Sequence, residues 1–290
     1  MDAGWAELCQ RIGKQLGKDV EPRGTSPLAG GCIHNASRLE TSAGTFFVKR
    51  NTAHCLEQFE AEAESLRAMA ATGTIRVPRP ILAAEAGGGA NLVLEYIEFG
   101  SGGGDAARRM GRELAQLHAV PQESFGWTRD NFIGPTPQPN PPVDDWPSFF
   151  RDHRLGWQFE LLAKQGVQFR RAEALLERLD RFFEDEPPQP SLLHGDLWGG
   201  NAGYAADGTP VVFDPAAYRG HDEADLAMTE LFGGFPAAFY EGYHAVRPKR
   251  AGYHRRRELY NLYHILNHAL LFGGGYAAQA ESMIDRLARG

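Results

Sequence analysis

Hydrophobic positions near the amino terminus recur at helical spacing. Apolar residues return every three or four positions over residues 5–16, which predicts a helix that ends at Gly17. The same spacing reappears over residues 56–71, so a second helix is predicted there, closed by Gly73. Apolar residues between the two predicted helices do not recur at helical spacing, so we expect strands in this stretch.

Strand-like alternation dominates the rest of this region. Residues 36–50 form two short apolar–polar runs around a turn at 42–44, which predicts a hairpin. Two further apolar runs, 81–86 and 91–97, flank three consecutive glycines and predict a second strand pair. Together these elements predict a small, mostly antiparallel sheet with one inserted helix.

Beyond residue 97 the pattern becomes mainly helical. Glycines at 100 and 102–104 indicate a joint, and 121–147 contains seven prolines, which predicts a long ordered loop. Two short apolar strands are expected at 191–194 and 210–213. Helices are predicted over four ranges: 105–118, 148–164, 171–184 and from about residue 222 onward. We therefore expect an α+β, bilobal protein: a small sheet-rich lobe over 1–97 and a larger, mostly helical lobe over 98–290.

Composition and charge exclude several classes of protein. The chain has 290 residues, 42% of them hydrophobic, and a net charge of −7, which argues against disorder and against broad nucleic-acid binding. A cluster of basic residues lies at 249–257, and we interpret it as the solvated start of a helix: Lys249, Arg250, Arg255, Arg256 and Arg257. No run of about 18 apolar residues predicts a membrane helix, and no secretory signal is visible. With only Cys9, Cys32 and Cys55 and no CxxC, we expect neither a disulfide scaffold nor a zinc site, and a cytoplasmic location.

The segment LLHGDLWGGN, residues 192–201, carries the most informative chemistry. Asp196 is followed five residues later by Asn201, and Asp214 ends the apolar strand Val211–Phe213. Phosphoryl transfer needs one carboxylate to orient the attacking hydroxyl and accept its proton, and amide and carboxylate oxygens to hold Mg²⁺. This spacing predicts Asp196 as the catalytic base and Asn201 and Asp214 as metal ligands. The alternative is a structural turn in which the aspartate only caps the chain.

The small lobe offers an independent test of that hypothesis. A kinase site needs a strand lysine near the phosphates and a helix glutamate that holds it. Lys49 lies on an otherwise apolar strand, and Glu62 lies on the apolar face of the helix that follows. A buried glutamate needs a cationic partner, so we predict a Lys49–Glu62 pair. The alternative is that the glutamates of this helix form only surface pairs.

Two further segments are weaker candidates for nucleotide contacts. Gly30 and Gly31 precede the hairpin, where glycines allow backbone N–H groups to approach phosphates. Paired glycines are also common in simple turns, and neither a GxGxxG nor a GK[ST] motif is present. Leu94, Glu95 and Ile97 lie where the lobes join and are predicted to meet the adenine of ATP; by sequence alone they are only a strand end.

Taken together, these residues resemble the aminoglycoside phosphotransferase and choline kinase group, and more closely the fructosamine kinase (ketosamine-3-kinase) family. The matching segments are spread over nearly the whole chain: GGCIHNASRL at 30–39, FGWTRDNFIGPTPQPN at 125–140, HGDLWGGN at 194–201, FDPAAYRGHDEADLAM at 213–228 and LYNLYHILNHALLFGGGY at 259–276.

The resemblance implies a protein-kinase-like fold and ATP- and Mg²⁺-dependent phosphorylation of the O3 hydroxyl of ketosamines. These are fructosamines or ribulosamines, free or protein-bound, and their phosphorylation leads to deglycation. It assigns Asp196, Asn201, Asp214, Lys49 and Glu62 the roles described above, and it makes His194 and Asp225 structural supports of the catalytic loop. A monomer is expected. The alternative is a small-molecule kinase of the aminoglycoside or choline type.

The substrate side of the site is less constrained. The resemblance makes Trp198 an apolar wall for the sugar or its amine substituent. Tyr218, His221 and Glu223 are candidate substrate contacts, with local packing as an equal alternative. Asp222 stands where the family commonly has arginine, and we expect it to cap the following helix; the alternative is that it favours cationic amine substituents of the substrate. A thiol at Cys32, in the presumptive phosphate loop, raises the hypothesis of redox control, with a simple filler role as the alternative.

Overall fold

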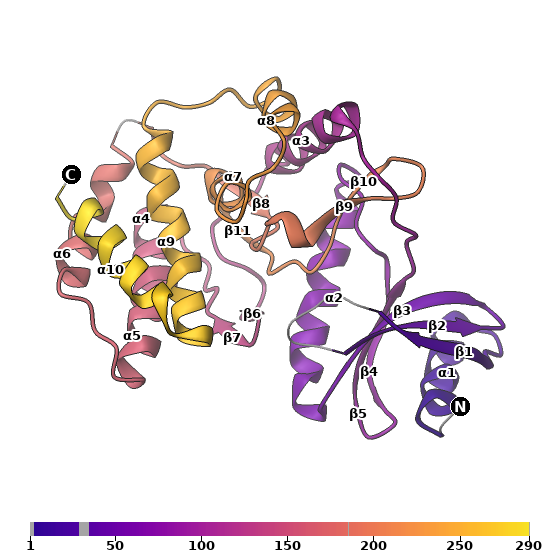
Figure 1. The fold of residues 1–290 in the computed structure, drawn as a ribbon. Helices are drawn as coiled ribbons and strands as arrows, with labels where there is room; N and C mark the ends of the chain where they lie inside the picture. Colours follow the sequence, from indigo (N-terminus) through magenta and orange to yellow (C-terminus); the bar gives the residue numbers. More distant parts are fainter. Residues whose placement is uncertain (1–2, 29–34, 185, 290) are drawn as a thin grey trace.

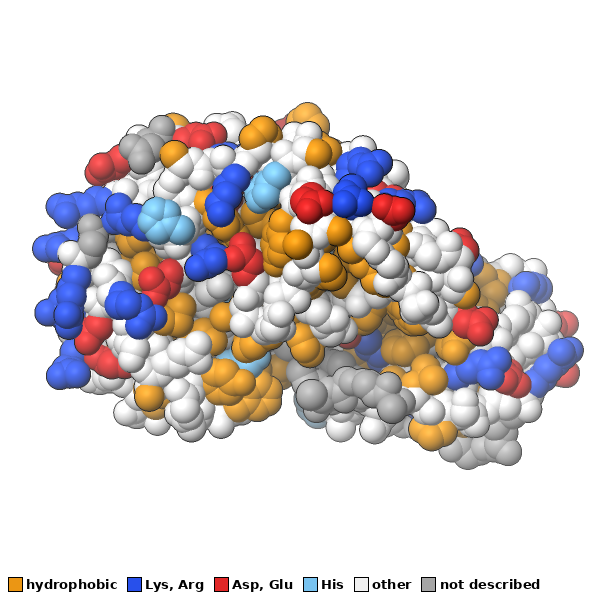
Figure 2. All heavy atoms as spheres, turned by 45° about the horizontal axis from the view of Figure 1, so that its top comes forward, with side chains coloured by type: hydrophobic (Ala, Val, Ile, Leu, Met, Phe, Trp, Pro, Cys, Tyr) orange, Lys and Arg blue, Asp and Glu red, His pale blue; other side chains and the backbone are white. Residues whose placement is uncertain are grey.

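The computed structural model describes residues 3–28, 35–184 and 186–289, and it divides the chain into two lobes (Figure 1). The small lobe is built on a five-stranded antiparallel sheet, and the large lobe is mainly helical. The predicted α+β bilobal architecture is confirmed. Hydrophobic side chains gather in the hollow between the lobes (Figure 2).

The sheet of the small lobe has the strand order β1-β2-β3-β5-β4. Its strands are β1 (Pro22–Pro27), β2 (Asn35–Thr41), β3 (Gly44–Asn51), β4 (Pro80–Ala86) and β5 (Gly89–Glu95). Both predicted hairpins are present, although β5 ends two residues earlier than expected. Strand β1 was not predicted, because a sequence with a proline at each end and no buried apolar residue has no strand signal; such a strand is tolerated at a sheet edge.

Each face of this sheet is covered by one helix. Helix α1 (Ala3–Leu16) packs on the face that carries Phe46 and Val48. Helix α2 (Leu56–Ala71) covers the opposite face, which carries Leu92 and Leu94 (Figure 1). Successive strand residues point to opposite faces, so Lys49, next to Val48, lies on the α2 side. The alternation of β3 therefore places a lysine under α2, and both predicted helices are confirmed.

The large lobe begins with α3 (Gly104–Ala119), which crosses α8 (Ala237–His244) at very short distance. Gly111 and Gly242 lie at this crossing: a Cβ atom on Gly111 would lie 1.9 Å from the carbonyl oxygen of Phe239. The remaining long helices are α7 (Glu223–Thr229), α9 (Tyr253–Phe272) and α10 (Gly275–Leu287). Helices α9 and α10 form a hairpin whose turn, Gly273 and Gly274, has left-handed backbone angles.

The proline-rich segment 121–147 is ordered, as predicted, and contains a short hairpin of β6 (Asn131–Ile133) and β7 (Thr136–Gln138). After it come α4 (Trp146–Phe150), a π-helical turn (Arg151–Gly156) and α5 (Trp157–Lys164). The single helix expected over 171–184 is instead α6 (Ala172–Leu176) followed by a 3₁₀ turn (Leu179–Phe182). Leu175, Leu179 and Phe182 are nevertheless buried.

Four short strands frame the candidate catalytic segment. Strand β8 (Pro190–Leu193) pairs with β11 (Tyr218–His221), and β9 (Ala202–Tyr204) pairs with β10 (Pro210–Val212). The two strands predicted here, β8 and β10, are confirmed, but each pairs with a strand that was not predicted. The missed strands β9 (AGY) and β11 (YRGH) lack the continuous run of large apolar residues that marked β8 and β10. Within the described residues, none of the helices is long and apolar enough to span a membrane.

Candidate active site

A buried lysine joins the two lobes. Lys49, on β3, is 6% exposed, and its Nζ lies 2.8 Å from both carboxylate oxygens of Glu62 on α2. The same Nζ lies 2.7 Å from Oδ1 of Asp214 in the large lobe. The predicted Lys49–Glu62 pair is confirmed, and the structure adds a second carboxylate. We call Lys49, Glu62 and Asp214 the cleft cluster.

The charges of the cleft cluster perturb one another. Burial alone would lower the pKa of Lys49, but the negative charges of Asp214 and Glu62 outweigh burial and raise that pKa above its ordinary value. Burial raises the pKa of Glu62, and Lys49 opposes this shift. Lys49 is therefore a permanent cation held between two acidic groups, one from each lobe.

Asp214 differs from its surroundings in backbone and in exposure. It follows β10, and its φ of 59° makes it the only non-glycine residue of the described chain in the left-handed region. Such strain persists where the surrounding structure enforces it, and it is concentrated at functional sites. The side chain of Asp214 is 39% exposed, whereas that of Lys49 is buried. A carboxylate held open to the cleft in this way can accept a ligand.

Asp196 and Asn201 lie beside this cluster in the loop after β8. The side-chain Nδ2 of Asn201 donates to the carbonyl oxygen of Asp196 at 2.9 Å and to its Oδ2 at 3.1 Å. Burial, followed by the charge of Asp214, raises the pKa of Asp196 to about 7. The structure therefore places the predicted base next to both predicted metal ligands.

The loop that carries Asp196 is held from beneath by Asp225 of α7. Its carboxylate accepts hydrogen bonds from the backbone N–H groups of His194 (2.7 Å) and Gly195 (2.9 Å), and it contacts Nε2 of His118 at 3.1 Å. His194 in turn contacts the carbonyl oxygen of Phe213 at 2.9 Å through Nε2. The supporting contacts expected of His194 and Asp225 are confirmed.

The donor set fits magnesium. Asp214 and Asn201 offer the carboxylate and amide oxygens that this ion prefers. A divalent cation would also relieve the repulsion between Asp196 and Asp214 that contributes to the raised pKa of Asp196. No three His, Cys, Asp or Glu side chains of the described residues converge on one metal position. Ligands from outside the chain, such as phosphate oxygens, would therefore have to complete the coordination.

The predicted connector segment lies where the lobes join. Leu94 is buried under the sheet, and Ile97 packs with Ala205 and Val211 of the large lobe. The carboxylate of Glu95 pairs with Arg76 at 2.9 Å, so its side chain stabilises the joint. Any contact to a nucleotide from Glu95 would thus be made by its backbone. Gly30, Gly31 and Cys32 lie outside the described residues.

Trp198 begins an exposed aromatic surface next to Asp196. Its side chain is 40% exposed, and its ring lies 6.3 Å from that of Phe232. The ring of His268 lies 4.8 Å from Phe232, 5.5 Å from Phe272 and 5.1 Å from Tyr276. We call these five residues the aromatic platform. Of these residues, only Trp198 was a sequence-based candidate; the repeated Leu-Phe-Gly-Gly at 231–234 and 271–274 was the available signal for Phe232 and Phe272.

Three predicted substrate residues have buried, structural positions instead. The ring of Tyr218 stacks with Phe149 and lies 4.0 Å from the guanidinium carbon of Arg154. Nδ1 of His221 lies 2.6 Å from the hydroxyl of Tyr260. Glu223 pairs with Arg256 at 2.6 Å. All three are buried, and the contacts they make are those that the packing alternative predicts.

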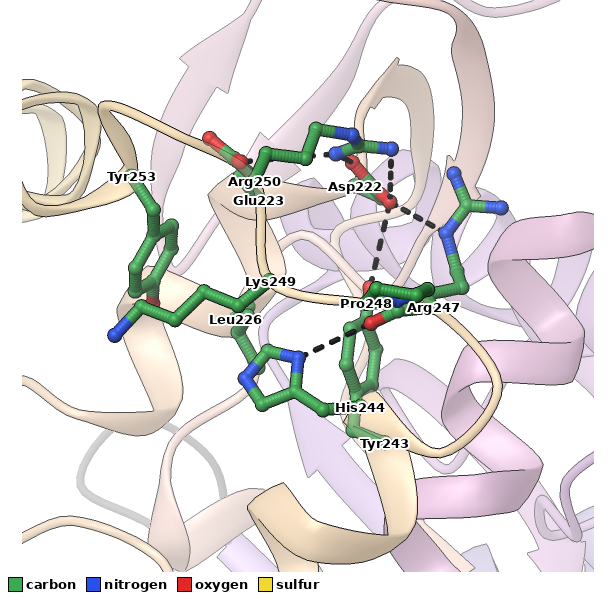
Figure 3. A pocket seen from close by; sticks show the side chains of 10 residues that line it. All are labelled: Asp222, Glu223, Leu226, Tyr243, His244, Arg247, Pro248, Lys249, Arg250 and Tyr253. Atoms are coloured by element: carbon green, nitrogen blue, oxygen red, sulfur yellow. Dashed lines mark hydrogen bonds and ion pairs between the residues drawn. The ribbon is translucent and has the colours of Figure 1, made fainter.

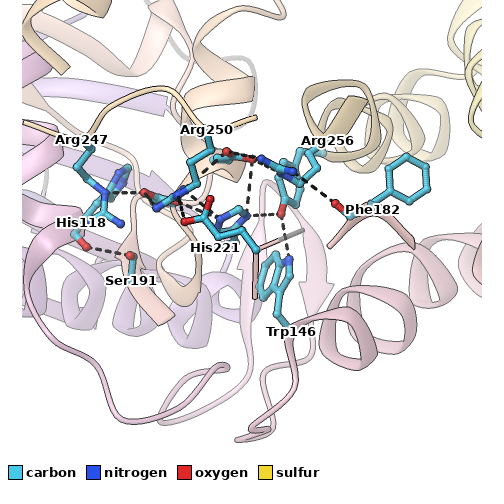
Figure 4. A network of polar contacts seen from close by, with 12 residues as sticks. His118, Trp146, Phe182, Ser191, His221, Arg247, Arg250 and Arg256 are labelled. Carbon is cyan, nitrogen blue, oxygen red and sulfur yellow. Dashed lines mark hydrogen bonds and ion pairs between the residues drawn. The ribbon is translucent and has the colours of Figure 1, made fainter. Parts of the chain in front are cut away.

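A second network of buried and partly buried charges lies in the large lobe, around Arg247, Arg250 and Arg256 (Figure 4). We call it the large-lobe cluster, and its members come from the start of α7 and from the chain around the start of α9: Asp222, Glu223, Arg247, Arg250 and Arg256. Here two expectations are wrong. Asp222 makes no capping hydrogen bond. The basic segment is also not simply solvated, because Arg256 is buried and Arg250 is largely covered.

Asp222 does not cap α7, because its carboxylate instead forms ion pairs with two arginines. Its oxygens lie 2.6 Å from Nε of Arg247 and 2.6 Å from Nη1 of Arg250 (Figure 3). Burial alone would raise the pKa of Asp222, yet the pKa is held well below its usual range. Burial also lowers the pKa of His221 to about 3. His221 is therefore neutral at pH 7, and the arginines account for the ionised state of Asp222.

Comparison with known proteins finds a family model and related proteins that match nearly the whole chain. The family model described as fructosamine kinase matches residues 4–289. A probable ketoamine kinase of Synechocystis sp. is 48% identical over 99% of this chain and 98% of its own. A chloroplastic protein-ribulosamine 3-kinase of Arabidopsis thaliana is 44% identical over 93% of this chain and 84% of its own. The crystal structure of a Haemophilus somnus protein named "putative fructosamine-3-kinase" superposes with a TM-score of 0.90 at 28% identity, covering 98% and 97% of the two chains.

Proposed function

The chain belongs to the fructosamine kinase family, and from this premise we propose that it transfers the γ-phosphoryl group of ATP to the O3 hydroxyl of a ketosamine. The observation that carries the proposal is the convergence of the cleft cluster with Asp196 and Asn201. A strand lysine, a helix glutamate and two loop carboxylates from separate parts of the chain meet at one place. Phosphoryl transfer requires this combination of a fixed cation and oxygen ligands.

The nucleotide is proposed to bind in the cleft between residues 1–97 and 98–290. Lys49 would exchange its contact with Asp214 for the α- and β-phosphates, while Glu62 keeps the ammonium in place. The backbone at 94–97 would face the adenine. Asn201 and Asp214 would hold magnesium, which offsets negative charge on the phosphates when it is bound.

Asp196 is the proposed base. Burial and the charge of Asp214 raise the pKa of Asp196 to about 7, and a general base is most effective when its pKa lies near the working pH. Asp196 would orient the sugar hydroxyl for in-line attack on the γ-phosphorus and accept the hydroxyl proton as the new P–O bond forms. Asn201 holds the Asp196 carboxylate through the 3.1 Å hydrogen bond. Positioning and electrostatics would supply most of the rate.

The aromatic platform is the proposed binding surface for the amine side of the substrate. A ketosamine carries a secondary amine that is protonated at neutral pH, and aromatic faces attract such cations. Trp198 lies two residues from Asp196, so a sugar placed at the base would direct its amine substituent toward the platform. Phosphorylation at O3 is proposed to make the adduct unstable, so that the free amine is released.

A second candidate function is phosphorylation of another hydroxyl compound of the aminoglycoside or choline type, which the same catalytic groups could serve. The test is a substrate panel of a ribulosamine, a fructosamine, an aminoglycoside and choline, with ATP consumption measured for each. We expect turnover with the ketosamines alone and a product that two-dimensional ³¹P–¹H NMR shows to be phosphorylated at O3. Turnover with only the aminoglycoside or choline would overturn the proposal.

A further inference from the structure

The large lobe has a second hollow next to the aromatic platform. It has a volume of about 330 Å³ and lies between α9, α10 and the segment after α7. Leu231, Asn261, Gln279 and Met283 are among the residues that line it. None of these residues contributes to the cleft cluster or to the catalytic loop, so the proposed phosphoryl transfer gives the hollow no role.

The lining of this hollow offers hydrogen-bonding groups without a net charge. Arg257 pairs with Glu230 at 2.6 Å, and Arg286 pairs with Glu258 at 2.6 Å. The charges at the hollow are therefore already compensated. Asn261 is only 7% exposed, and its Oδ1 has no hydrogen-bond partner among the described residues. A buried amide oxygen without a partner is costly, and a bound donor would satisfy it.

The hollow continues from the aromatic platform along both helices. Leu231 directly precedes Phe232 of the platform. On α9, Asn261 lies seven residues before His268, which is two turns or about 10 Å along one helix face. On α10, Gln279 lies three residues after Tyr276, one turn further along the same side. A ligand that leaves the platform along α9 and α10 therefore enters the hollow.

We propose that this hollow binds the polypeptide around a ketosamine-modified lysine, an inference that rests on the proposed function. The four methylenes of the lysine would run over the aromatic platform, and the peptide groups flanking it would reach Asn261 and Gln279. Amide side chains match peptide N–H and C=O groups as both donors and acceptors. A free amino acid would bring an uncompensated carboxylate to a hollow whose arginines already have acidic partners.

The test compares two substrates that carry the same sugar. One is free Nε-ribulosyl-lysine, and the other is a nine-residue peptide with Nε-ribulosyl-lysine at its centre. Gln279→Trp fills the hollow from an exposed position on α10, and Ser282→Trp, exposed on the same helix but outside the hollow, is the matched control. We expect Gln279→Trp to lower kcat/KM for the peptide about tenfold and to leave the free amino acid within twofold, with Ser282→Trp resembling the wild type.

A second variant removes the hydrogen-bonding group itself. Asn261→Leu should raise KM for the peptide without changing kcat for free ribulosyl-lysine, provided that its thermal melting shows a folded protein. Equal losses on both substrates, no loss in Gln279→Trp, or a wild type that phosphorylates only the free amino acid would overturn the inference. Failure of the wild type on both substrates would instead overturn the proposed function, so the two failures are distinguishable.

Discussion

The cleft cluster and the large-lobe cluster each contain buried charges, yet they differ in what surrounds those charges. In the cleft, one lysine contacts two carboxylates from different lobes, and Asp214 is open to solvent. In the large lobe, Asp222 and Glu223 are buried, and each has an arginine partner within 2.6 Å. The first group has an excess of acid and an open side, whereas in the second both carboxylates are buried and three arginines outnumber them.

This difference shows that buried charge alone does not identify an active site. A search for acids paired with buried cations would select Glu223, the partner of Arg256, as readily as Glu62, the partner of Lys49. A search for buried histidines would select His221 as readily as His194. The cleft residues are distinguished by incomplete compensation: a strained backbone at Asp214 and a carboxylate at Asp196 whose pKa is raised to about 7. Substitutions in the two clusters should therefore affect different properties.

The sharpest contrast is expected from Asp196→Ala. Loss of the base and of its orienting contact should lower kcat with a ketosamine about 10³-fold. Stability should not fall, because the raised pKa shows that the buried carboxylate is unfavourable to the folded state. A coupled ATP assay and thermal melting measure the two effects. Asp207→Ala, on an exposed turn nearby, is the control; near-normal turnover of Asp196→Ala would contradict the assigned role.

Glu223→Ala should show the opposite behaviour. It leaves Arg256 buried without its carboxylate, so the free energy of unfolding should fall by about 3–5 kcal/mol. Asp152→Ala, which removes an exposed pair with Arg151, should cost less than about 1 kcal/mol. Urea titration gives both values. The folded fraction of Glu223→Ala should keep its KM for the ketosamine. A large rise in KM would instead show that Glu223 contacts the substrate.

Glu62→Gln tests whether the cleft cluster acts as a unit. Lys49 would keep Asp214 as its only carboxylate partner and would be misplaced for the phosphates, so kcat/KM for ATP should fall about 10²-fold. Glu60→Gln, exposed on the same helix, is the matched control. Equal kinetics in the two variants would show that the Lys49–Glu62 pair has no part in nucleotide binding.

The pH dependence of stability should report the buried histidines of the large lobe. Burial lowers the pKa of both His221 and His264 to about 3. Between pH 6.5 and 3 the unfolded chain binds protons on these histidines that the folded chain does not. The stability that the two neutral histidines allow is therefore complete above pH 6.5, and it is lost as the pH falls toward 3. Each should contribute a slope of about 1 kcal/mol per pH unit. Urea titrations of wild type and His264→Asn from pH 7 to 4.5 test this, and identical slopes would refute it.

The smallest effect is expected where α2 contacts the large lobe. Nε2 of Gln58, one turn before Glu62, donates to the carbonyl oxygen of Gly134 at 2.5 Å. Glu64 also contacts Thr128, and Glu57 pairs with Arg129. Gln58→Ala should loosen α2 and raise KM for ATP about threefold, consistent with the loss of one hydrogen bond. An unchanged KM for ATP would show that the other contacts suffice to hold the helix.

Much of the site could be predicted because its elements are local in sequence. Asp196 and Asn201 belong to one loop, and the period of two in β3 and of 3.6 in α2 indicated that Lys49 and Glu62 face each other. Strands β1, β9 and β11 were missed, because none of them contains a continuous run of large apolar residues. The basic segment at 249–257 was misinterpreted, because its acidic partners lie about 25–35 residues earlier.

Local pattern thus dictated the two lobes, the sheet with its covering helices, and the choice of candidate catalytic groups. Packing alone determined that Asp222 meets Arg250 rather than capping α7, and that Phe232 and Tyr276 join Trp198 on one surface. It also created the hollow beside Asn261. The physical reason is that periodicity orients a side chain relative to its own helix or strand, whereas a contact between distant segments depends on how whole elements dock.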